Sequence, residues 1–216
     1  MTRRRIVLLA LVVVLAGVGA AVWWALSGDS PPPPTLDPAG TSVPDVGRGS
    51  FAVDEVDSFV GYRVREEYVS FGVRDAVGRT SAVDGGIRVV GPRVVAADLT
   101  ADLRTLHSDK SQRDATLHSR ALESDRYPMA RFLLGAPLRL ARDGAVAQGR
   151  LTLHGQTAPV RVRVRGQRLS RDEIELVGST PIRFADFGID PPSVAGLVTV
   201  RDHGALEFRL RLRRSP

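Results

Sequence analysis

The sequence predicts a mainly β protein, in which antiparallel strands close on themselves and one helical excursion interrupts them. Apolar and charged side chains alternate strictly from Leu206 to Arg213, and they do so again from Val160 to Arg165. Alternation with a period of two gives a strand one apolar and one solvated face. Many such strands hide their apolar faces together most readily as a sandwich or a barrel.

The N-terminus predicts a membrane anchor, with residues 1–5 as a cytoplasmic flank and residues 6–26 as a transmembrane helix. Arg3, Arg4 and Arg5 precede an uncharged stretch from Ile6 to Leu26. As a helix this stretch spans about 30 Å, which matches the hydrocarbon core of a bilayer. Arginines next to a membrane segment stay in the cytoplasm. We therefore expect a single-pass cell-membrane protein whose C-terminal domain is extracytoplasmic.

The alternative for this segment is a signal peptide that is cleaved, which would leave a secreted protein. The apolar stretch is longer than the usual apolar region of a signal peptide, which favours the uncleaved anchor. Residues 27–50 then predict a linker, because they contain the proline run from Pro31 to Pro34 among small polar residues. A proline run forms a stiff, extended spacer.

Residues 51–216 predict the folded domain, because short alternating segments there are separated by turn-forming dipeptides. Turns are expected at Gly91-Pro92 and Arg171-Asp172, and also at Gly85-Gly86 and from Asp202 to Gly204. One segment, from Asp109 to Leu122, has a helical pattern instead. Its Asp109 and Gln112 form a weak capping box, and its Leu117 and Ala121 share a helical face.

Composition narrows the function classes. The formal charge is +6, but nearly all the cations are arginines that alternate along strands, which indicates a solvated strand face and no nucleic-acid partner. The absence of cysteine excludes disulfides, thiol catalysis and cysteine-based metal sites.

No catalytic or metal-binding motif stands out. His107, Asp109, Asp114 and His118 are close in sequence, but they match no metal signature. The chain has no GxSxG sequence and no glycine-rich phosphate loop. We therefore expect no enzyme, no cofactor and no metal.

Four motifs in the middle and C-terminal parts of the chain occur in a distinctive order. They are RD-x-x-L from Arg113, YP-x-x-x-F from Tyr127, G-x-LTLHG-x-T-x-PV from Gly149, and DFGI from Asp186. In this order and spacing the chain resembles the YceI-like family of polyisoprenoid-binding, lipocalin-like proteins, from Phe51 to Arg213. It departs from the family at Glu66-Glu67, where members often carry a histidine.

The resemblance implies an eight-stranded antiparallel barrel with a helix near one end. It also implies export, and an elongated apolar interior that binds an isoprenoid or similar long-chain lipid. The apolar residues expected to line the ligand site are Phe71, Val73, Leu117, Leu122, Phe132, Leu134, Val162, Phe184, Phe187, Phe208 and Leu210.

Other motif residues are interpreted as structural. Arg113 and Asp114 begin the helix and would attach it to the barrel through a buried ion pair. His154 and Thr157 flank the Gly155-Gln156 turn and would bond to its backbone. Gly188 follows Phe187 where the chain must bend, a position that suits glycine.

Two other functions remain open at this stage. An eight-stranded barrel can be filled by its own side chains, which would make this a structural or protein-interaction module. The third hypothesis is an enzyme that acts on isoprenoid lipids and uses His107, Asp114 or His118. The sequence leaves the oligomeric state open, a homodimer included.

Overall fold

The computed structural model describes residues 30–38, 41–42, 48–68, 72–140, 144–191, 193–194 and 198–215. The predicted transmembrane segment, residues 6–26, lies outside these ranges, and so does Phe71. The helices within the described ranges are too short or too polar to cross a bilayer. Residues 32–216 form one compact unit, to which the following description refers.

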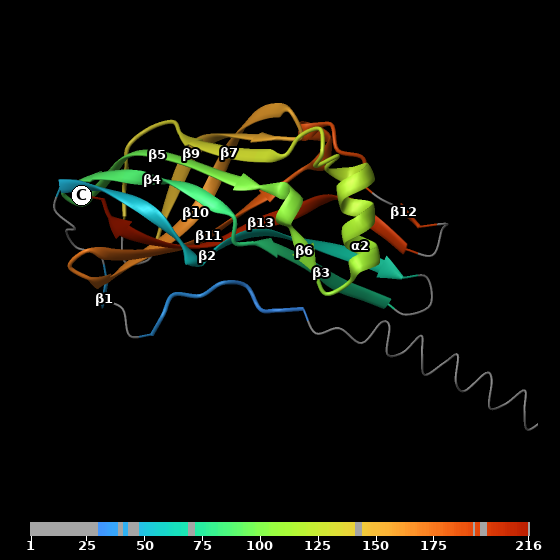
Figure 1. The fold of residues 1–216 in the computed structure, drawn as a ribbon, viewed down its shortest axis with the longest axis horizontal. Helices are drawn as coiled ribbons and strands as arrows, with labels where there is room; N and C mark the ends of the chain where they lie inside the picture. Colours follow the sequence, from blue (N-terminus) through green and yellow to red (C-terminus); the bar gives the residue numbers. More distant parts are fainter. Residues whose placement is uncertain are drawn as a thin grey trace, which may run out of the picture. The chain divides into compact units, whose positions relative to one another are not determined.

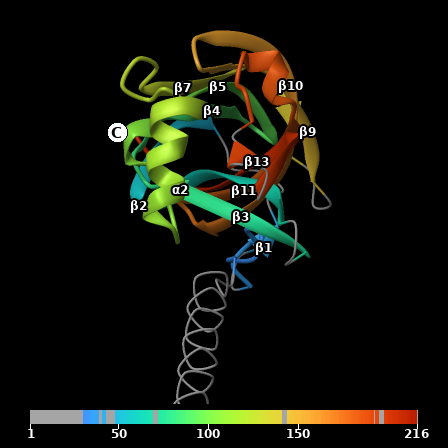
Figure 2. The ribbon, with the colours of Figure 1, turned by 90° about the vertical axis from the view of Figure 1, so that its right-hand side faces the viewer.

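A closed ring of antiparallel strands dominates this unit (Figures 1 and 2). Each strand of the ring pairs with the next, and the last pairs with the first, which confirms the predicted barrel of eight strands. In order round the ring they are β2 (Arg48–Tyr68), β4 (Val83–Val90), β5 (Arg93–Asp102), β7 (Met129–Leu134), β9 (Ala145–Leu153), β10 (Gln156–Ser170), β11 (Glu173–Ile182) and β13 (Val198–Arg214).

Strand β2 is long enough to serve two neighbours. Its first residues pair with β4, and its second half pairs with β3 (Gly72–Thr80). Against β13 its register jumps between the pairs Arg209↔Phe59 and Arg211↔Asp54. A bulge of this kind bends a strand, so β2 can pass from one neighbour to the other.

Short strands extend the ring locally. They are β1 (Thr41–Ser42) beside β10, β6 (His107–Ser108) beside β3, β8 (Leu138–Arg139) beside β5, and β12 (Ser193–Val194) beside β13.

The predicted helix is confirmed, although it is shorter than expected. It consists of α2 (Ser111–Thr116) continued by a π-helical turn, η2 (Leu117–Ala121), and it lies at one end of the barrel (Figures 1 and 2). Two 3-10 turns, η1 (Leu103–Thr105) and η3 (Phe184–Phe187), complete the elements of the described residues. The predicted capping box is wrong, because the Asp109 carboxylate accepts a hydrogen bond from the Arg113 guanidinium instead.

Two predicted turns are confirmed and two are wrong. Gly91-Pro92 joins β4 to β5, and Arg171-Asp172 joins β10 to β11. Gly85-Gly86 instead lies inside β4, where a Cβ on Gly86 would come within 2.2 Å of the Phe51 carbonyl oxygen. The segment from Asp202 to Gly204 lies inside β13, at a register shift. Glycine within a strand marks a close backbone approach or a bulge, not only a turn.

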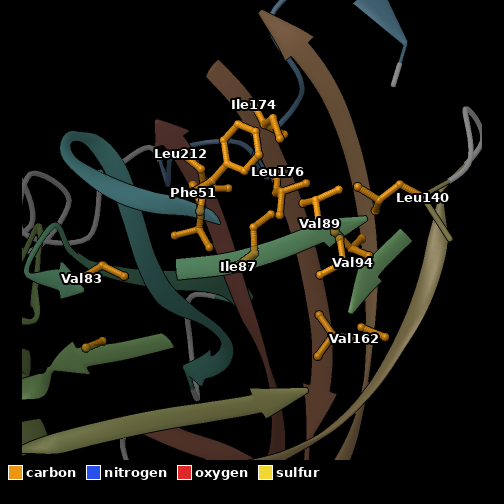
Figure 3. Packing of buried hydrophobic residues seen from close by; sticks show 14 residues of the cluster. Phe51, Val83, Ile87, Val89, Val94, Leu140, Val162, Ile174, Leu176 and Leu212 are labelled. Atoms are coloured by element: carbon orange, nitrogen blue, oxygen red, sulfur yellow. The ribbon is translucent and has the colours of Figure 1, made fainter. Parts of the chain in front are cut away.

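The apolar interior forms two clusters. The barrel cluster (Figure 3) comprises Phe51, Val83, Ile87, Val89, Val94, Ala101, Leu140, Ala147, Val162, Val164, Ile174, Leu176, Leu210 and Leu212. The helix-end cluster comprises Leu103, Leu106, Ala121, Leu122, Leu151, Leu153, Ile182, Phe184, Phe187 and Ile189. Their members come from strands all round the ring, so the alternating apolar faces do meet inside.

Residues 32–38, which are one described part of the predicted linker, lie against the outer wall of the barrel. Arg79 on β3 donates to the Pro32 carbonyl oxygen at 3.1 Å, and Arg209 on β13 donates to that of Thr35. The Asp37 amide donates to Glu175 on β11 at 2.8 Å, and Gln167 on β10 donates to the Asp37 carbonyl oxygen at 2.7 Å. The segment therefore crosses several strands, and the arginine-rich wall supplies donors to its carbonyl groups.

Glu175 is central to this contact, and we expect that its substitution lowers the stability of the fold. Its carboxylate is fully buried, accepts from Asp37 and Gln167, and lies 3.3 Å from the Arg209 guanidinium. Removing one partner of a buried ion pair costs about 3 kcal/mol or more. We predict that Glu175→Ala lowers the free energy of unfolding by about 3 kcal/mol. Urea unfolding of the full chain in detergent, followed by circular dichroism, measures this loss.

The matched control is Glu55→Ala, because Glu55 is exposed on β2. Surface substitutions of this kind change stability by no more than about 0.5 kcal/mol. Equal unfolding midpoints for the two variants would contradict the role assigned to Glu175.

Candidate functional site

The inner face of β13 is packed tightly at one end and loosely at the other. Leu210 and Leu212 are at most 1% exposed, whereas Leu206 and Phe208 on the same face are only partly buried. Phe208 pairs with Val60 across the β13–β2 seam, and Val60 is also only partly buried. The interior is therefore packed unevenly along its length.

Partly buried apolar residues form a middle belt next to the two clusters. The belt comprises Val60 and Tyr62 on β2, Leu99 on β5, Phe132 and Leu134 on β7, Val160 on β10, and Leu206 and Phe208 on β13. Val160 packs against both clusters, which places the belt where they meet. Because these strands surround the interior, inner-face surface that solvent can still reach indicates incomplete packing there. A slender apolar molecule could cover this surface.

The structure places most of the predicted ligand residues inside the barrel, but in different surroundings. Phe132, Leu134 and Phe208 belong to the middle belt. The remaining interior ones are Val162 and Leu210 in the barrel cluster, and Leu117, Leu122, Phe184 and Phe187 in or against the helix-end cluster.

Val73 does not face the interior. It is 56% exposed at the start of β3 and pairs with Glu67, two residues from Asp75 on the same outward face. Its apolar side chain suggested an inner position, but the register of β3 decides which face each residue takes. Conversely, Val160 and Leu206 were missed, although alternation with Val162 and Phe208 would have found them.

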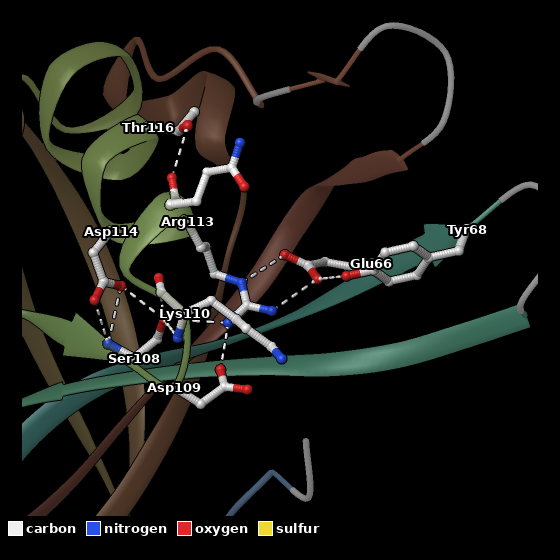
Figure 4. A network of polar contacts seen from close by, with 9 residues as sticks. Glu66, Tyr68, Ser108, Asp109, Lys110, Arg113, Asp114 and Thr116 are labelled. Atoms are coloured by element: carbon white, nitrogen blue, oxygen red, sulfur yellow. Dashed lines mark hydrogen bonds and ion pairs between the residues drawn. The ribbon is translucent and has the colours of Figure 1, made fainter. Parts of the chain in front are cut away.

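A polar network attaches the helix to the barrel wall (Figure 4). The Arg113 guanidinium donates two hydrogen bonds to Glu66 on β2, at 2.9 and 3.1 Å, and the Tyr68 hydroxyl donates to the same carboxylate at 2.6 Å. Asp114 accepts from the Ser108 amide at 2.9 Å and from its hydroxyl at 2.7 Å. Arg113 and Asp114 thus join α2 to β2 and β6.

Burial sets the ionisation of the groups near this network. Burial raises the pKa of Tyr62 to about 12, and it also raises the pKa of Tyr68, together with the hydrogen bond to Glu66. Burial opposes the charge on Arg113, but Glu66 and Asp109 outweigh it and raise its pKa above the ordinary value. The phenols are therefore neutral and Arg113 is charged at any physiological pH.

His154 contacts the neighbouring loops, not the backbone of its own turn. Its Nδ1 lies 3.1 Å from the Phe187 carbonyl oxygen, and its Nε2 lies 3.0 Å from the Glu123 carboxylate. His154 and Gly155 both have positive φ, as in the tight turns that connect hairpin strands. The histidine therefore ties the β9–β10 hairpin to η3 at the helix end.

Thr157 and Gly188 also have clear structural environments. The Thr157 hydroxyl lies 2.9 Å from that of Thr152, its register partner on β9. Gly188 has φ +63° at the end of η3, a left-handed conformation that favours glycine.

The residues considered for metal binding or catalysis each have other partners. His107 Nδ1 lies 3.1 Å from the Thr105 carbonyl oxygen, and the two nitrogens of His118 lie near Ser124 Oγ and the Leu106 carbonyl oxygen. Within the described residues, no three histidine, aspartate or glutamate side chains are grouped as metal ligands would be.

A family model described as the YceI-like domain matches residues 51–212 of the chain. The chain belongs to the YceI-like family. The match begins three residues into β2 and ends two residues before the last residue of β13, so the YceI-like domain comprises the closed ring and the helix.

Solved structures show the same fold. The BcnA protein of Burkholderia cenocepacia aligns with a TM-score of 0.61 and 18% identity, over 74% of this chain and 98% of that protein. A polyisoprenoid binding domain from Saccharophagus degradans, implicated in plant cell wall breakdown, aligns with a TM-score of 0.59 and 18% identity. That alignment covers 78% of this chain and 99% of the domain. No curated protein matches the sequence.

The polar network between α2 and β2 of this YceI-like domain predicts that substitution of Arg113 destabilises the fold and loosens the helix. Arg113→Ala would leave the buried Glu66 carboxylate without its cation, so we expect a loss of about 3 kcal/mol in the free energy of unfolding. Amide hydrogen exchange in α2 and η2 should also become faster than in the rest of the barrel. Arg120→Ala on the exposed face of η2 is the control, and it should change neither quantity. Unchanged exchange in Arg113→Ala would show that the helix is held by apolar packing alone.

The raised pKa of Tyr62 predicts that the free energy of unfolding depends on pH in the alkaline range. Its folded-state pKa of about 12 exceeds the ordinary value near 10, so the unfolded chain loses this proton first. Stability contributed by the neutral phenol is complete below pH 10 and falls as the pH rises toward 12, by about 2 kcal/mol. Tyr62→Phe should remove much of this alkaline loss. Unfolding free energies measured between pH 9 and 12 test this, and parallel curves for the two proteins would contradict it.

Proposed function

We propose that this protein is a membrane-anchored, extracytoplasmic lipid-binding protein that holds a polyisoprenoid or another long-chain amphiphile inside the barrel. The middle belt is the observation that carries the proposal. Its apolar side chains lie on the inner face of a closed sheet and are still only partly buried, so part of their surface is left uncovered. A fully packed interior would not leave such surface.

The energetics of apolar burial suit a ligand without a charged anchor. Transfer of a CH₂ group from water to an apolar interior contributes about 0.8 kcal/mol. A chain of about ten carbons would thus contribute about 8 kcal/mol before the entropic cost of binding. Predicted residues Phe132, Leu134 and Phe208 lie where such a chain would bind.

The comparisons and the N-terminal sequence supply the remaining support. The Saccharophagus degradans domain, which shares the fold, is a polyisoprenoid binding domain. Arg3 to Arg5 followed by the uncharged stretch from Ile6 to Leu26 favours an anchor with the barrel outside the cytoplasm. Held at the membrane, the barrel would meet isoprenoid lipids where they reside.

Lipid carried through purification is the direct test. The full chain, purified in mild detergent and examined by native mass spectrometry, should carry a lipid that organic extraction identifies as long-chain and apolar. Val160→Phe would add bulk at the middle belt, where both clusters meet, and should lower the affinity for the lipid at least about fivefold, since overpacking there costs about 1–3 kcal/mol.

The matched control is Val90→Phe, the same substitution at a side chain that is 38% exposed on β4. It should carry as much lipid as the wild type. Repeated purification of a folded wild-type chain without any lipid, or equal occupancy of the two variants, would overturn the proposal.

A further inference from the structure

The outer face of β10 carries a row of exposed arginines. Arg161, Arg163 and Arg165 point outward, while Val162 and Val164 between them are buried inside the barrel. Arg150 on the neighbouring strand β9 is exposed and pairs with Pro159, which extends the row by another two residues. At about 3.3 Å per residue, the four guanidinium groups span about 20 Å of wall.

These four charges are uncompensated within the described part of the chain. None of the four side chains forms a hydrogen bond or an ion pair there. Their register partners are all uncharged, namely Pro159 and Leu133 for Arg150, Gln148 for Arg161, Val146 and Ser179 for Arg163, and Val177 for Arg165.

Arginines on β7 and β13 behave differently. Arg131 on β7 lies 2.6 Å from Asp98, and Arg211 on β13 lies 2.8 Å from Asp57. On β13, Arg209 and Arg213 also pair with carboxylates. Four unpaired arginines therefore lie together on the β9–β10 face, whereas these arginines of β7 and β13 are neutralised by carboxylates.

Exposed apolar side chains lie beside the unpaired arginines. Leu133 on β7 is 37% exposed, and its register partner is Arg150. Val146 on β9 is 46% exposed, and its register partner is Arg163. Surfaces that combine cations with apolar side chains fit the boundary between headgroups and acyl chains in a bilayer.

We propose that the outer face of β9 and β10, with the adjoining edge of β7, docks onto the surface of a bilayer that contains anionic phospholipids. The arginines would contact lipid phosphates, and Leu133 and Val146 would enter the interface. Nucleic acid fits this face less well, because its outward residues include no aromatic side chain on which a base could stack. The proposal goes beyond ligand binding in the barrel and does not depend on it.

Because the chain contains no cysteine, a single introduced cysteine can be labelled specifically. In Gln148→Cys, a spin label would sit on the exposed face opposite Arg161. The full chain is reconstituted into nanodiscs of phosphatidylcholine, with and without phosphatidylglycerol. We expect anionic lipid to shield this label from a water-soluble relaxation agent, and high salt to reverse the shielding. A label at Val56→Cys, 89% exposed on β2, should remain accessible in both lipids.

Substitutions identify the groups responsible. The combined variant Arg161→Gln, Arg163→Gln and Arg165→Gln should lower the equilibrium constant for docking about 100-fold, at about fivefold for each cation near an anionic surface. The control combines Arg88→Gln, Arg120→Gln and Arg171→Gln, which removes the same charge from exposed positions elsewhere. The control should retain the shielding.

Equal accessibility of the Gln148 label in neutral and anionic nanodiscs would overturn the proposal. So would shielding by duplex DNA without shielding by anionic lipid, which would assign the face to nucleic acid. The outcome of this labelling experiment is independent of whether lipid co-purifies in the barrel interior. An unshielded label would leave the bound lipid unaffected, and an empty lumen would leave membrane docking unaffected.

Discussion

The pairing of β13 with β2 is the interaction on which the rest of this structure depends. It closes the sheet, so that both edges of the ring find backbone partners and all the alternating apolar faces share one interior. The seam is also where packing changes along the barrel. On the same inner face of β13, Leu210 and Leu212 are fully buried, whereas Leu206 and Phe208 are not. Closure therefore creates the enclosed apolar surface that a lipid would need.

The two ends of the interior are fixed by different forces. Away from the helix, the barrel cluster is held by apolar packing, including Phe51 and Leu212 (Figure 3). At the helix end, charge-assisted hydrogen bonds add to the apolar contacts, because Arg113 binds Glu66 on β2 (Figure 4). Buried ion pairs contribute little net stability but are costly to break, so this pair fixes where the helix sits. The helix in turn carries Leu117 and Leu122 to the interior.

Charge divides the outer wall into two kinds of surface. Around β11 and β13, arginines pair with carboxylates, and residues 32–38 lie over part of this wall through Glu175 and Gln167. On β9 and β10, Arg150, Arg161, Arg163 and Arg165 have no such partners among the described residues. The same alternating sequence pattern therefore yields a covered, neutralised wall on one side and an open, cationic one on the other. The difference depends on which strands are neighbours.

The local sequence pattern determined the strands, the helix near residues 109–122 and the family, since period-two alternation and short motifs are properties of neighbouring residues. It also identified Phe132, Leu134 and Phe208 as inward-facing. The sequence pattern could not determine the register of the strands. Val73 faces outward opposite Glu67 because of the register in which β2 pairs with β3. The Glu66–Arg113 contact and the position of residues 32–38 join segments far apart in the chain. Such contacts depend on how the sheet closes, so only the tertiary structure could decide them.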